Sequence, residues 1–181
     1  AVSIKISNEW GKAILIYGNN CIAHLNDLKD LMKGVQLLLD KDGVFVIECN
    51  YWGGMVKNTN YSLIYHDHFS YFSILPWIKF SKKYGLKPFD AVVTPAQGGS
   101  LRLFLSKGKK KLTKRYRELI NEEKKSELNT LKTSTKYREN VISVSTKLRK
   151  LILNLKKDGK KIAGYGAAAK GMTILKCSNI G

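Results

Sequence analysis

The sequence predicts an α/β protein, and two patterns along the chain lead to this prediction. A short apolar strand at residues 13–17, a helix over residues 25–39 and a second apolar strand at residues 44–48 follow one another through short connections. Strand, helix and strand in this order form a right-handed parallel unit of an α/β sheet. Farther along, strands at residues 86–93 and 100–105 are joined by a short turn without a helix. This arrangement predicts an antiparallel pair at the end of the sheet.

The residues between these strands support the remaining elements of the sheet domain. The first helix has leucine, methionine and valine at helical spacing, and either Asn26 or Asp27 is its expected N-cap. Residues 50–60 are rich in glycine, asparagine and tyrosine, and we expect them to form a loop. Residues 75–84 have the pattern of a helix that a glycine closes.

The C-terminal part of the chain has a different pattern. Residues 109–155 are expected to be largely helical, with an interruption around residues 129–134. Residues 162–165 predict a new strand, and the glycine-rich turn after it opens a helix through residues 172–176. This sequence of elements is typical of the start of another α/β unit.

These patterns divide the chain into three parts. Residues 1–107 form the predicted sheet domain, residues 108–158 a basic helical connector and residues 159–181 the start of a second α/β domain. The chain starts without a methionine, and it stops after a short helix that would normally lead to another strand. We therefore expect a fragment of a longer protein, cut on both sides.

The strongest compositional signal is charge. The 181 residues have a formal net charge of +18, and an apolar content of 44% indicates a folded protein. Lysines concentrate in residues 107–161, but five glutamates lie among them and aromatic residues are not interleaved. We therefore favour a solvated helical face over a nucleic-acid-binding surface. A basic nucleic-acid-binding module stays as an alternative, and steeply salt-dependent binding would support it.

The cysteines and the hydropathy pattern indicate a cytoplasmic protein without a membrane partner. Cys21, Cys49 and Cys177 are far apart and in no CxxC spacing, which argues against a disulfide framework or a zinc site in this chain. No segment has the roughly 18 uninterrupted apolar residues that a membrane span needs. The N-terminus also has no basic and then apolar signal peptide.

The candidate chemistry lies at the ends of the predicted parallel strands. His24 follows the first strand, and His66 and His68 follow the loop that leaves the second strand. Ligands of open α/β sheets bind at the carboxyl ends of the strands, so the two clusters can converge on one cleft. Imidazole is the side chain whose ordinary pKa suits proton transfer near neutrality.

The order Tyr65-His66-Asp67-His68 fits the removal of a proton next to a carbonyl. An acid beside an imidazole raises its basicity, and a phenol can donate to a developing enolate. In an extended segment His66 and His68 would share one face, whereas in a turn all four side chains could lie together. A surface cluster without function is the alternative, and a metal site is not expected because no further ligands complete a set.

Residues 164–171 resemble a strand–turn–helix loop that cradles phosphates. Small residues allow close approach, amides at the helix start point at the anion, and Lys170 adds charge. The segment is neither a strict GxGxxG nor a P-loop, so a tightly packed turn is the alternative interpretation. A dinucleotide-dependent oxidoreductase is a second functional alternative, for which an acid about 20 residues downstream would be expected.

Four segments together resemble the nucleotide-sugar C-methyltransferases, which use S-adenosylmethionine. These segments are residues 19–24, 64–73, 98–102 and 164–171. The resemblance implies the C-terminal half of a class I methyltransferase with a Rossmann-like sheet. It also implies methyl transfer to a carbon alpha to the ketone of a dTDP-linked 4-keto-6-deoxy sugar.

The resemblance also implies roles for single residues. His68 would be the general base, with Tyr65, Asp67 and His24 supporting it. Asn19 and Asn20 would contact the methyl donor. The nucleotide sugar would contact the glycine-rich turns, at Gly98, Gly99, Gly164, Tyr165, Gly166 and Lys170.

The chain departs from the family pattern at several points. Asp67 replaces the usual glutamate, and Gln97 stands where a histidine is common. The family's glycine-rich loop for the cofactor, the acid that holds its ribose and the N-terminal zinc-binding module are not in this sequence. We therefore expect zinc only in that missing module, and we expect this chain alone to bind the cofactor poorly and to be inactive.

Overall fold

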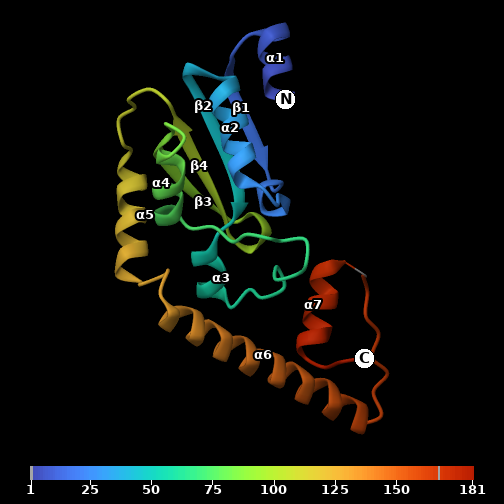
Figure 1. The fold of residues 1–181 in the computed structure, drawn as a ribbon. Coiled ribbons are helices and arrows are strands. Elements are labelled where there is room, and N and C mark those ends of the chain that lie inside the picture. The colour runs from blue at the N-terminus through green and yellow to red at the C-terminus, as the bar shows by residue number, and fades with distance from the viewer. Residues whose placement is uncertain (1, 167) are drawn as a thin grey trace.

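The computed structural model describes residues 2–166 and 168–181, and its centre is an open sheet of four strands (Figure 1). The strand order is β1-β2-β4-β3. The pair β1 and β2 is parallel, whereas β4 runs antiparallel to both β2 and β3. The strands are β1 (Ala13–Asn19), β2 (Leu39–Asn50), β3 (Lys87–Thr94) and β4 (Ser100–Ser106). The mixed α/β sheet, its parallel unit and its antiparallel pair are thus confirmed.

Helices flank this sheet and extend the molecule to one side (Figure 1). None of the helices in the described ranges is long and apolar enough to cross a membrane. The α-helices are α1 (Val2–Trp10), α2 (Leu28–Leu38), α3 (Trp52–Asn58), α4 (Ile74–Lys82), α5 (Lys114–Lys125), α6 (Leu131–Lys157) and α7 (Ala169–Cys177). Two 3₁₀ turns, η1 (Ile22–His24) and η2 (Ala96–Gly98), follow β1 and β3.

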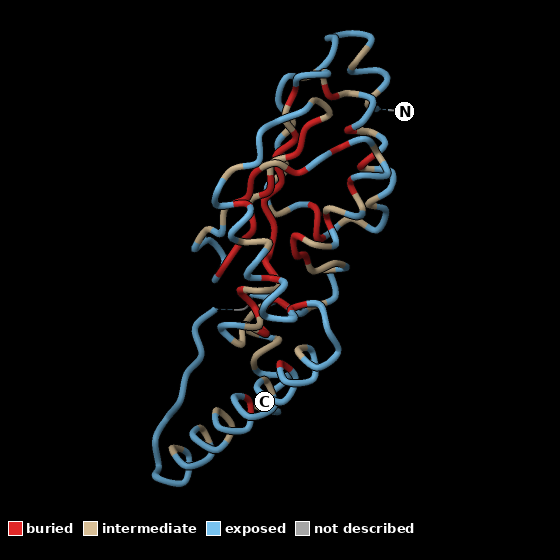
Figure 2. The backbone as a smooth tube through the Cα atoms, turned by 90° about the vertical axis from the view of Figure 1, so that its left-hand side faces the viewer, coloured by how far each residue is buried: buried red, intermediate tan, exposed pale blue. Residues whose placement is uncertain are grey.

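The core lies between the two central strands and the helices beside them. Phe45 and Ile47 of β2 and Leu101, Leu103 and Leu105 of β4 are at most 1% exposed. Figure 2 shows the buried backbone gathered in the α/β body, while α6 and the C-terminal segment are mostly exposed. Truncating one of these aliphatic side chains to alanine typically costs about 2–5 kcal/mol. The core therefore fixes the strand ends at which ligands of such sheets bind.

The cap of α2 resolves one choice that the sequence leaves open. The Asp27 carboxylate accepts hydrogen bonds from the backbone N–H groups of Lys29 and Asp30, at 2.8 and 3.0 Å. These bonds satisfy two of the free donors at the helix start. Asp27, rather than Asn26, is therefore the N-cap.

The expected loop at residues 50–60 is wrong, because α3 forms there. Met55 is 1% exposed, and a Cβ atom on Gly54 would lie 3.4 Å from the Cα of Gly99. The two backbones therefore pack closely, and this contact overrides the weak helix propensity of a Gly- and Asn-rich segment. The predicted break in the C-terminal helical region is confirmed, but it lies at residues 126–130, and α5 begins only at residue 114.

The strand expected at residues 162–165 is also wrong. These residues belong to no helix or strand, and Tyr165 is fully exposed. A strand needs a partner for its backbone groups, and none of the described residues pairs with this segment. Of the elements expected for the start of a second α/β domain, the described residues contain α7 and no strand, and that domain stays a prediction.

One buried carboxylate connects all four strands. Glu48 of β2 is 3% exposed, and it accepts hydrogen bonds from Tyr17 of β1 (3.3 Å), Thr94 of β3 (3.0 Å) and Arg102 of β4 (2.9 Å). Burial opposes ionisation of this carboxyl group, but the three donors, Arg102 foremost, outweigh it and lower the pKa of Glu48. Glu48 is therefore ionised and bonded at neutral pH.

Glu48→Gln is expected to lower the free energy of unfolding by about 2 kcal/mol at pH 7. Because the pKa of Glu48 is lower in the folded state, its contribution is present at neutral pH and is lost as the pH falls through the folded pKa. Urea unfolding at a series of acidic pH values should therefore show a flatter pH dependence for the variant. The control Glu118→Gln removes an exposed carboxylate and should change stability by less than about 0.5 kcal/mol. Equal effects of the two substitutions would contradict this role.

A second buried carboxylate holds the start of α4. Glu123 of α5 is 1% exposed and accepts hydrogen bonds from the backbone N–H groups of Ile74 (2.7 Å) and Leu75 (3.1 Å). Desolvation raises the pKa of Glu123, although these two donors act in the opposite direction. A side chain from α5 thus caps a helix almost 50 residues earlier in the chain.

Glu123→Ala is expected to destabilise the protein by about 2–3 kcal/mol, because the buried N–H of Ile74 and the partly buried N–H of Leu75 lose their acceptor. The neighbouring Glu122 is exposed, so Glu122→Ala should change the free energy of unfolding by less than about 0.5 kcal/mol. Urea unfolding at pH 7 measures both values. The capping role is refuted if the two variants are equally stable.

Candidate functional site

A pocket of about 230 Å³ lies at the carboxyl ends of β1 and β2. It brings together His24, Tyr65 and His68, so the convergence expected from the sequence is confirmed. The rings of His24 and His68 are 4.8 Å apart between centroids. The lining residues are Asn20, Ala23, His24, Cys49, Asn50, Leu63, Tyr65, His68, Gln97 and Lys170. We call this cavity the histidine pocket.

Backbone contacts shape residues 65–68, which we call the histidine motif. The N–H of His68 donates to the carbonyl of Tyr65 at 3.0 Å, which closes a turn. The N–H of Phe69 donates to the carbonyl of Ala23 at 2.8 Å, which ties this turn to η1. The segment is therefore a turn, and the extended alternative is wrong.

The hydrogen bonds of His68 determine its tautomer. Its Nδ1 lies 2.7 Å from the carbonyl oxygen of Leu63, and a carbonyl oxygen can only accept. Nδ1 therefore carries the proton, and Nε2 of the neutral ring accepts from the Tyr65 hydroxyl at 2.8 Å. The amide nitrogen of Asn50 lies at the longer distance of 3.3 Å from Nδ1 and cannot donate to it in this tautomer. The basic nitrogen of His68 is thus Nε2, the nitrogen that faces Tyr65.

The surroundings of His68 favour its neutral form. Desolvation lowers the pKa of His68, and the nearby His24 and Lys170 lower it further, against the Leu63 carbonyl and Asp67. Desolvation and the charge of Asp67 raise the pKa of Tyr65. At neutral pH the pocket therefore contains a neutral imidazole and a protonated phenol, which are the forms of a base and a hydrogen-bond donor.

A backbone carbonyl also fixes one ring nitrogen of His24. Its Nδ1 lies 2.9 Å from the carbonyl oxygen of Asp67, which can only accept, so Nδ1 carries a proton. The side chains of His66 and Asp67 turn away from the pocket and pair with each other at 3.1 Å, with 85% and 59% of their surfaces exposed. Of the predicted catalytic residues, His68, Tyr65 and His24 meet in the pocket, whereas Asp67 reaches it through its backbone.

Of the two residues predicted to bind the methyl donor, Asn19 and Asn20, only Asn20 lines the histidine pocket. Asn20 has a left-handed backbone (φ 50°), and its N–H donates to the carbonyl of Glu48 at 2.8 Å. The side chain of Asn19 is exposed, outside the pocket lining. Non-glycine residues in this conformation concentrate at functional sites.

The predicted phosphate-binding turn also separates into two parts. Gly164, Tyr165 and Gly166 are exposed and lie away from the pocket, and Ala167 lies outside the described residues. Lys170, in the first turn of α7, lines the histidine pocket instead. Without a strand before this turn, the described segment does not have the dinucleotide-binding geometry that the oxidoreductase alternative requires.

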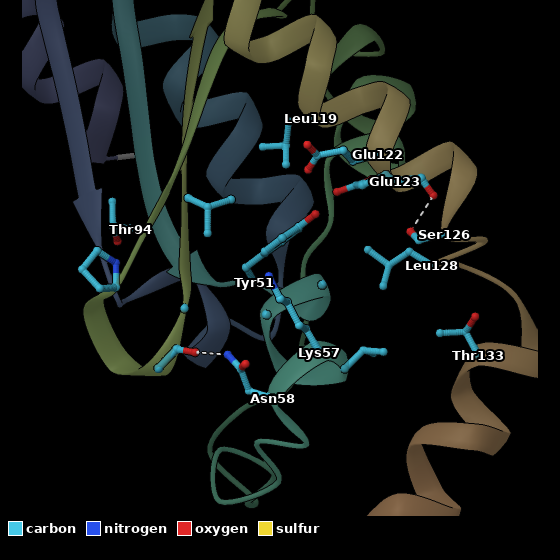
Figure 3. Close-up of a pocket in the computed structure, with 17 residues that line it drawn as sticks. Tyr51, Lys57, Asn58, Thr94, Leu119, Glu122, Glu123, Ser126, Leu128 and Thr133 are labelled. Atoms are coloured by element: carbon cyan, nitrogen blue, oxygen red, sulfur yellow. Dashed lines mark hydrogen bonds between the residues drawn. The ribbon is translucent and has the colours of Figure 1, made fainter.

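Gly98 and Gly99 border a second, larger cavity of about 970 Å³, which lies between η2, α3, α5 and the start of α6 (Figure 3). Both have positive φ, at 81° and 125°, and a Cβ on Gly98 would lie 2.6 Å from the Asn60 side chain. Glycine is therefore required there by the turn itself. Tyr51 and Leu119 are among the side chains on the wall of this cavity in Figure 3.

The sequence interpretation missed three contributors to the histidine pocket. Asn50 ends β2, so the rule that placed His24 at a strand end could have found it. Gln97, whose role the sequence left open, lines the pocket from η2. Leu63 acts through its carbonyl oxygen, which no sequence pattern reveals. Among the described residues, no group of three or more His, Cys, Asp or Glu side chains is arranged to hold a metal ion.

Two comparisons with known proteins relate this chain to C-methyltransferases. Residues 95–181 match the model of a family described as the C-methyltransferase C-terminal domain. Over 182 residues the chain is 31% identical to the C-methyltransferase NovU of Streptomyces niveus. This alignment covers 99% of the chain but 43% of NovU, so the chain spans less than half of that protein.

NMR titration of the imidazole C–H signals tests the state of His68. We expect His68 to titrate below the ordinary value of 6.5, with ¹⁵N shifts of the Nδ1–H tautomer. Tyr65→Phe should raise the pKa of His68, because the tyrosine hydroxyl stabilises the neutral ring by donating to Nε2. A His68 signal that titrates at or above 6.5 in the unsubstituted protein would contradict this assignment.

Proposed function

We propose that the protein methylates a sugar carbon. The premise is that this chain belongs to the C-methyltransferase family and corresponds to its C-terminal portion. The donor would be S-adenosylmethionine, and the acceptor the carbon alpha to the ketone of a dTDP-linked 4-keto-6-deoxy sugar. The observation that carries this proposal is the neutral His68, whose Nε2 faces Tyr65 in a pocket beside His24.

His68 would act as the general base. Its Nε2 takes the proton as the carbon–hydrogen bond breaks, and the electron pair of that bond moves into an enolate. Nδ1 remains bonded to the Leu63 carbonyl throughout, so the ring stays in place while it gains positive charge. His68 thus offers one nitrogen, Nε2, that can accept a proton, and a second, Nδ1, that the Leu63 carbonyl anchors.

Tyr65 would serve the oxygen of the same enolate. In the present structure its hydroxyl donates to Nε2 of His68, so it must leave that nitrogen before the base can accept a proton. Rotation about the phenolic C–O bond lets the same hydroxyl donate to the developing oxyanion. Burial raises the pKa of Tyr65, which keeps this donor protonated at neutral pH.

The enolate carbon would then bond to the methyl group of the donor. S-adenosylmethionine would supply that electrophilic methyl group, and its carbon–sulfur electron pair would stay with sulfur. Asn20 would contact this donor, and its position in the pocket lining at the end of β1 supports that role. The glycine-rich loop and the ribose-binding acid of such donor sites are not in this sequence.

The two histidines of the motif, His66 and His68, provide a matched test of the base. In the full-length protein, His68→Ala should abolish exchange of the alpha proton of a dTDP-linked 4-keto-6-deoxyhexose with D₂O, while binding of this sugar survives. His66→Ala should leave exchange unchanged, because that side chain is 85% exposed and outside the pocket. Mass spectrometry measures the exchange, and calorimetry the binding.

Unchanged exchange in His68→Ala would assign the base elsewhere, and His24 is the next imidazole in the pocket. The proposed function itself fails if the unsubstituted protein exchanges no proton and transfers no methyl group to such a sugar.

A further inference from the structure

The C-terminal segment reaches back to the histidine pocket through Lys170. Its ammonium group donates a hydrogen bond to the side-chain oxygen of Gln97, which is 73 residues earlier in the chain. One turn farther along α7, the Thr173 hydroxyl lies 3.4 Å from the carbonyl oxygen of Ile64. These contacts bring the start of α7 against η2 and against the residue before the histidine motif.

Lys170 is the only lysine or arginine among the described residues that line the pocket. Its hydrogen-bond partner is a neutral amide, and it forms no ion pair with any described aspartate or glutamate. A carboxylate in place of Gln97 would neutralise the ammonium, whereas an amide fixes its position and leaves its charge available. The Gln97 backbone also has a positive φ of 55°, a strained conformation of the kind that concentrates at functional sites.

We propose that Lys170 stabilises the negative charge on the substrate oxygen while His68 takes the proton from the adjacent carbon, and that Gln97 positions Lys170 for this role. This inference rests on the proposed function. It moves Lys170 from the diphosphate, which the sequence suggested, to the reacting end of the sugar. Gly164 and Gly166, the other members of that predicted phosphate site, are exposed and away from the pocket.

The charge balance of the pocket supports this role. Proton transfer from carbon to Nε2 turns two neutral partners into an imidazolium and an enolate. Lys170 forms no hydrogen bond with His68, so it repels the imidazolium only across the pocket. The enolate oxygen, by contrast, can accept a hydrogen bond from the Lys170 ammonium directly. The other titratable rings near His68 are those of His24, Tyr65 and Tyr71, and the charge of Asp67 acts on it from outside the pocket.

The decisive experiment compares two lysines of α7 in the full-length protein. Lys170 is half-buried and lines the pocket, whereas Lys176 is exposed at the other end of the helix. The probe is a dTDP-linked 4-keto-6-deoxyhexose in D₂O, and the readout is the rate of alpha-proton exchange at saturating sugar. Lys170→Met should lower this rate about 100-fold, the usual effect of removing one donor to an oxyanion. Lys170→Arg should restore most of the rate, and Lys176→Met should leave it unchanged.

Two further measurements distinguish this role from others. The acidic limb of the exchange profile should move to higher pH in Lys170→Met, because losing the ammonium raises the pKa of His68. Misfolding that left the charge of Lys170 away from His68 in both proteins would not produce this shift, whereas the rate difference between Lys170→Met and Lys170→Arg reports the contact with the substrate oxygen. The affinity for dTDP alone should stay within about threefold, since the proposed contact is with the sugar.

Each contrary outcome identifies what has failed. Full exchange in Lys170→Met, or a large loss of dTDP affinity with normal exchange at saturation, overturns the role of Lys170 and leaves the proposed function in place. Absence of exchange in the unsubstituted protein overturns the proposed function, and this role with it.

Discussion

A single buried carboxylate determines how the strands of this protein meet. Glu48 can be ionised inside the sheet only because donors from the other three strands surround it, since an unpaired buried charge is strongly unfavourable. Arg102 is paired directly with Glu48, whereas Tyr17 and Thr94 reach the carboxylate from positions two residues away along their own strands. Glu48 is two residues before Asn50, where β2 ends and the histidine pocket begins. The register of the sheet and the position of the pocket thus depend on the same interaction.

The pocket itself is held mainly by backbone groups. The carbonyl oxygens of Leu63 and Asp67 each bind a histidine ring, and that of Ala23 anchors the residue after the motif. Carbonyl oxygens cannot donate, so they fix which ring nitrogen carries the proton. Both imidazoles are therefore oriented without a carboxylate partner. The acid of the motif, Asp67, influences His68 through its charge from outside the pocket.

Much of the sheet and part of the site could be predicted from the sequence, because they depend on local patterns. Apolar periodicity located the four strands, and the rule for strand ends placed His24 and His68 in one cleft. The errors arose where distant partners decide the outcome. Residues 52–58 are helical because Gly54 packs on Gly99, and residues 162–165 are not a strand because no described strand pairs with them. The turn at residues 65–68 likewise sends neighbouring side chains in different directions, which spacing alone cannot reveal.

The connection between the sheet and Lys170 shows how a distant segment can complete a site. Helix α6 has 27 residues and is therefore about 40 Å long. It is anchored near its start, where the Tyr137 hydroxyl donates to the carbonyl of Asn60 at 3.1 Å and its ring packs edge-on against Trp52. The chain then returns, and Arg149 of α6 donates to the carbonyl of Asn179 behind α7. Helix α6 is mostly exposed and makes few other contacts with the sheet. These contacts and the hydrogen bond from Lys170 to Gln97 therefore set where the Lys170 ammonium lies relative to His68. The charge of the pocket is thus controlled by a part of the chain that contributes little to the core.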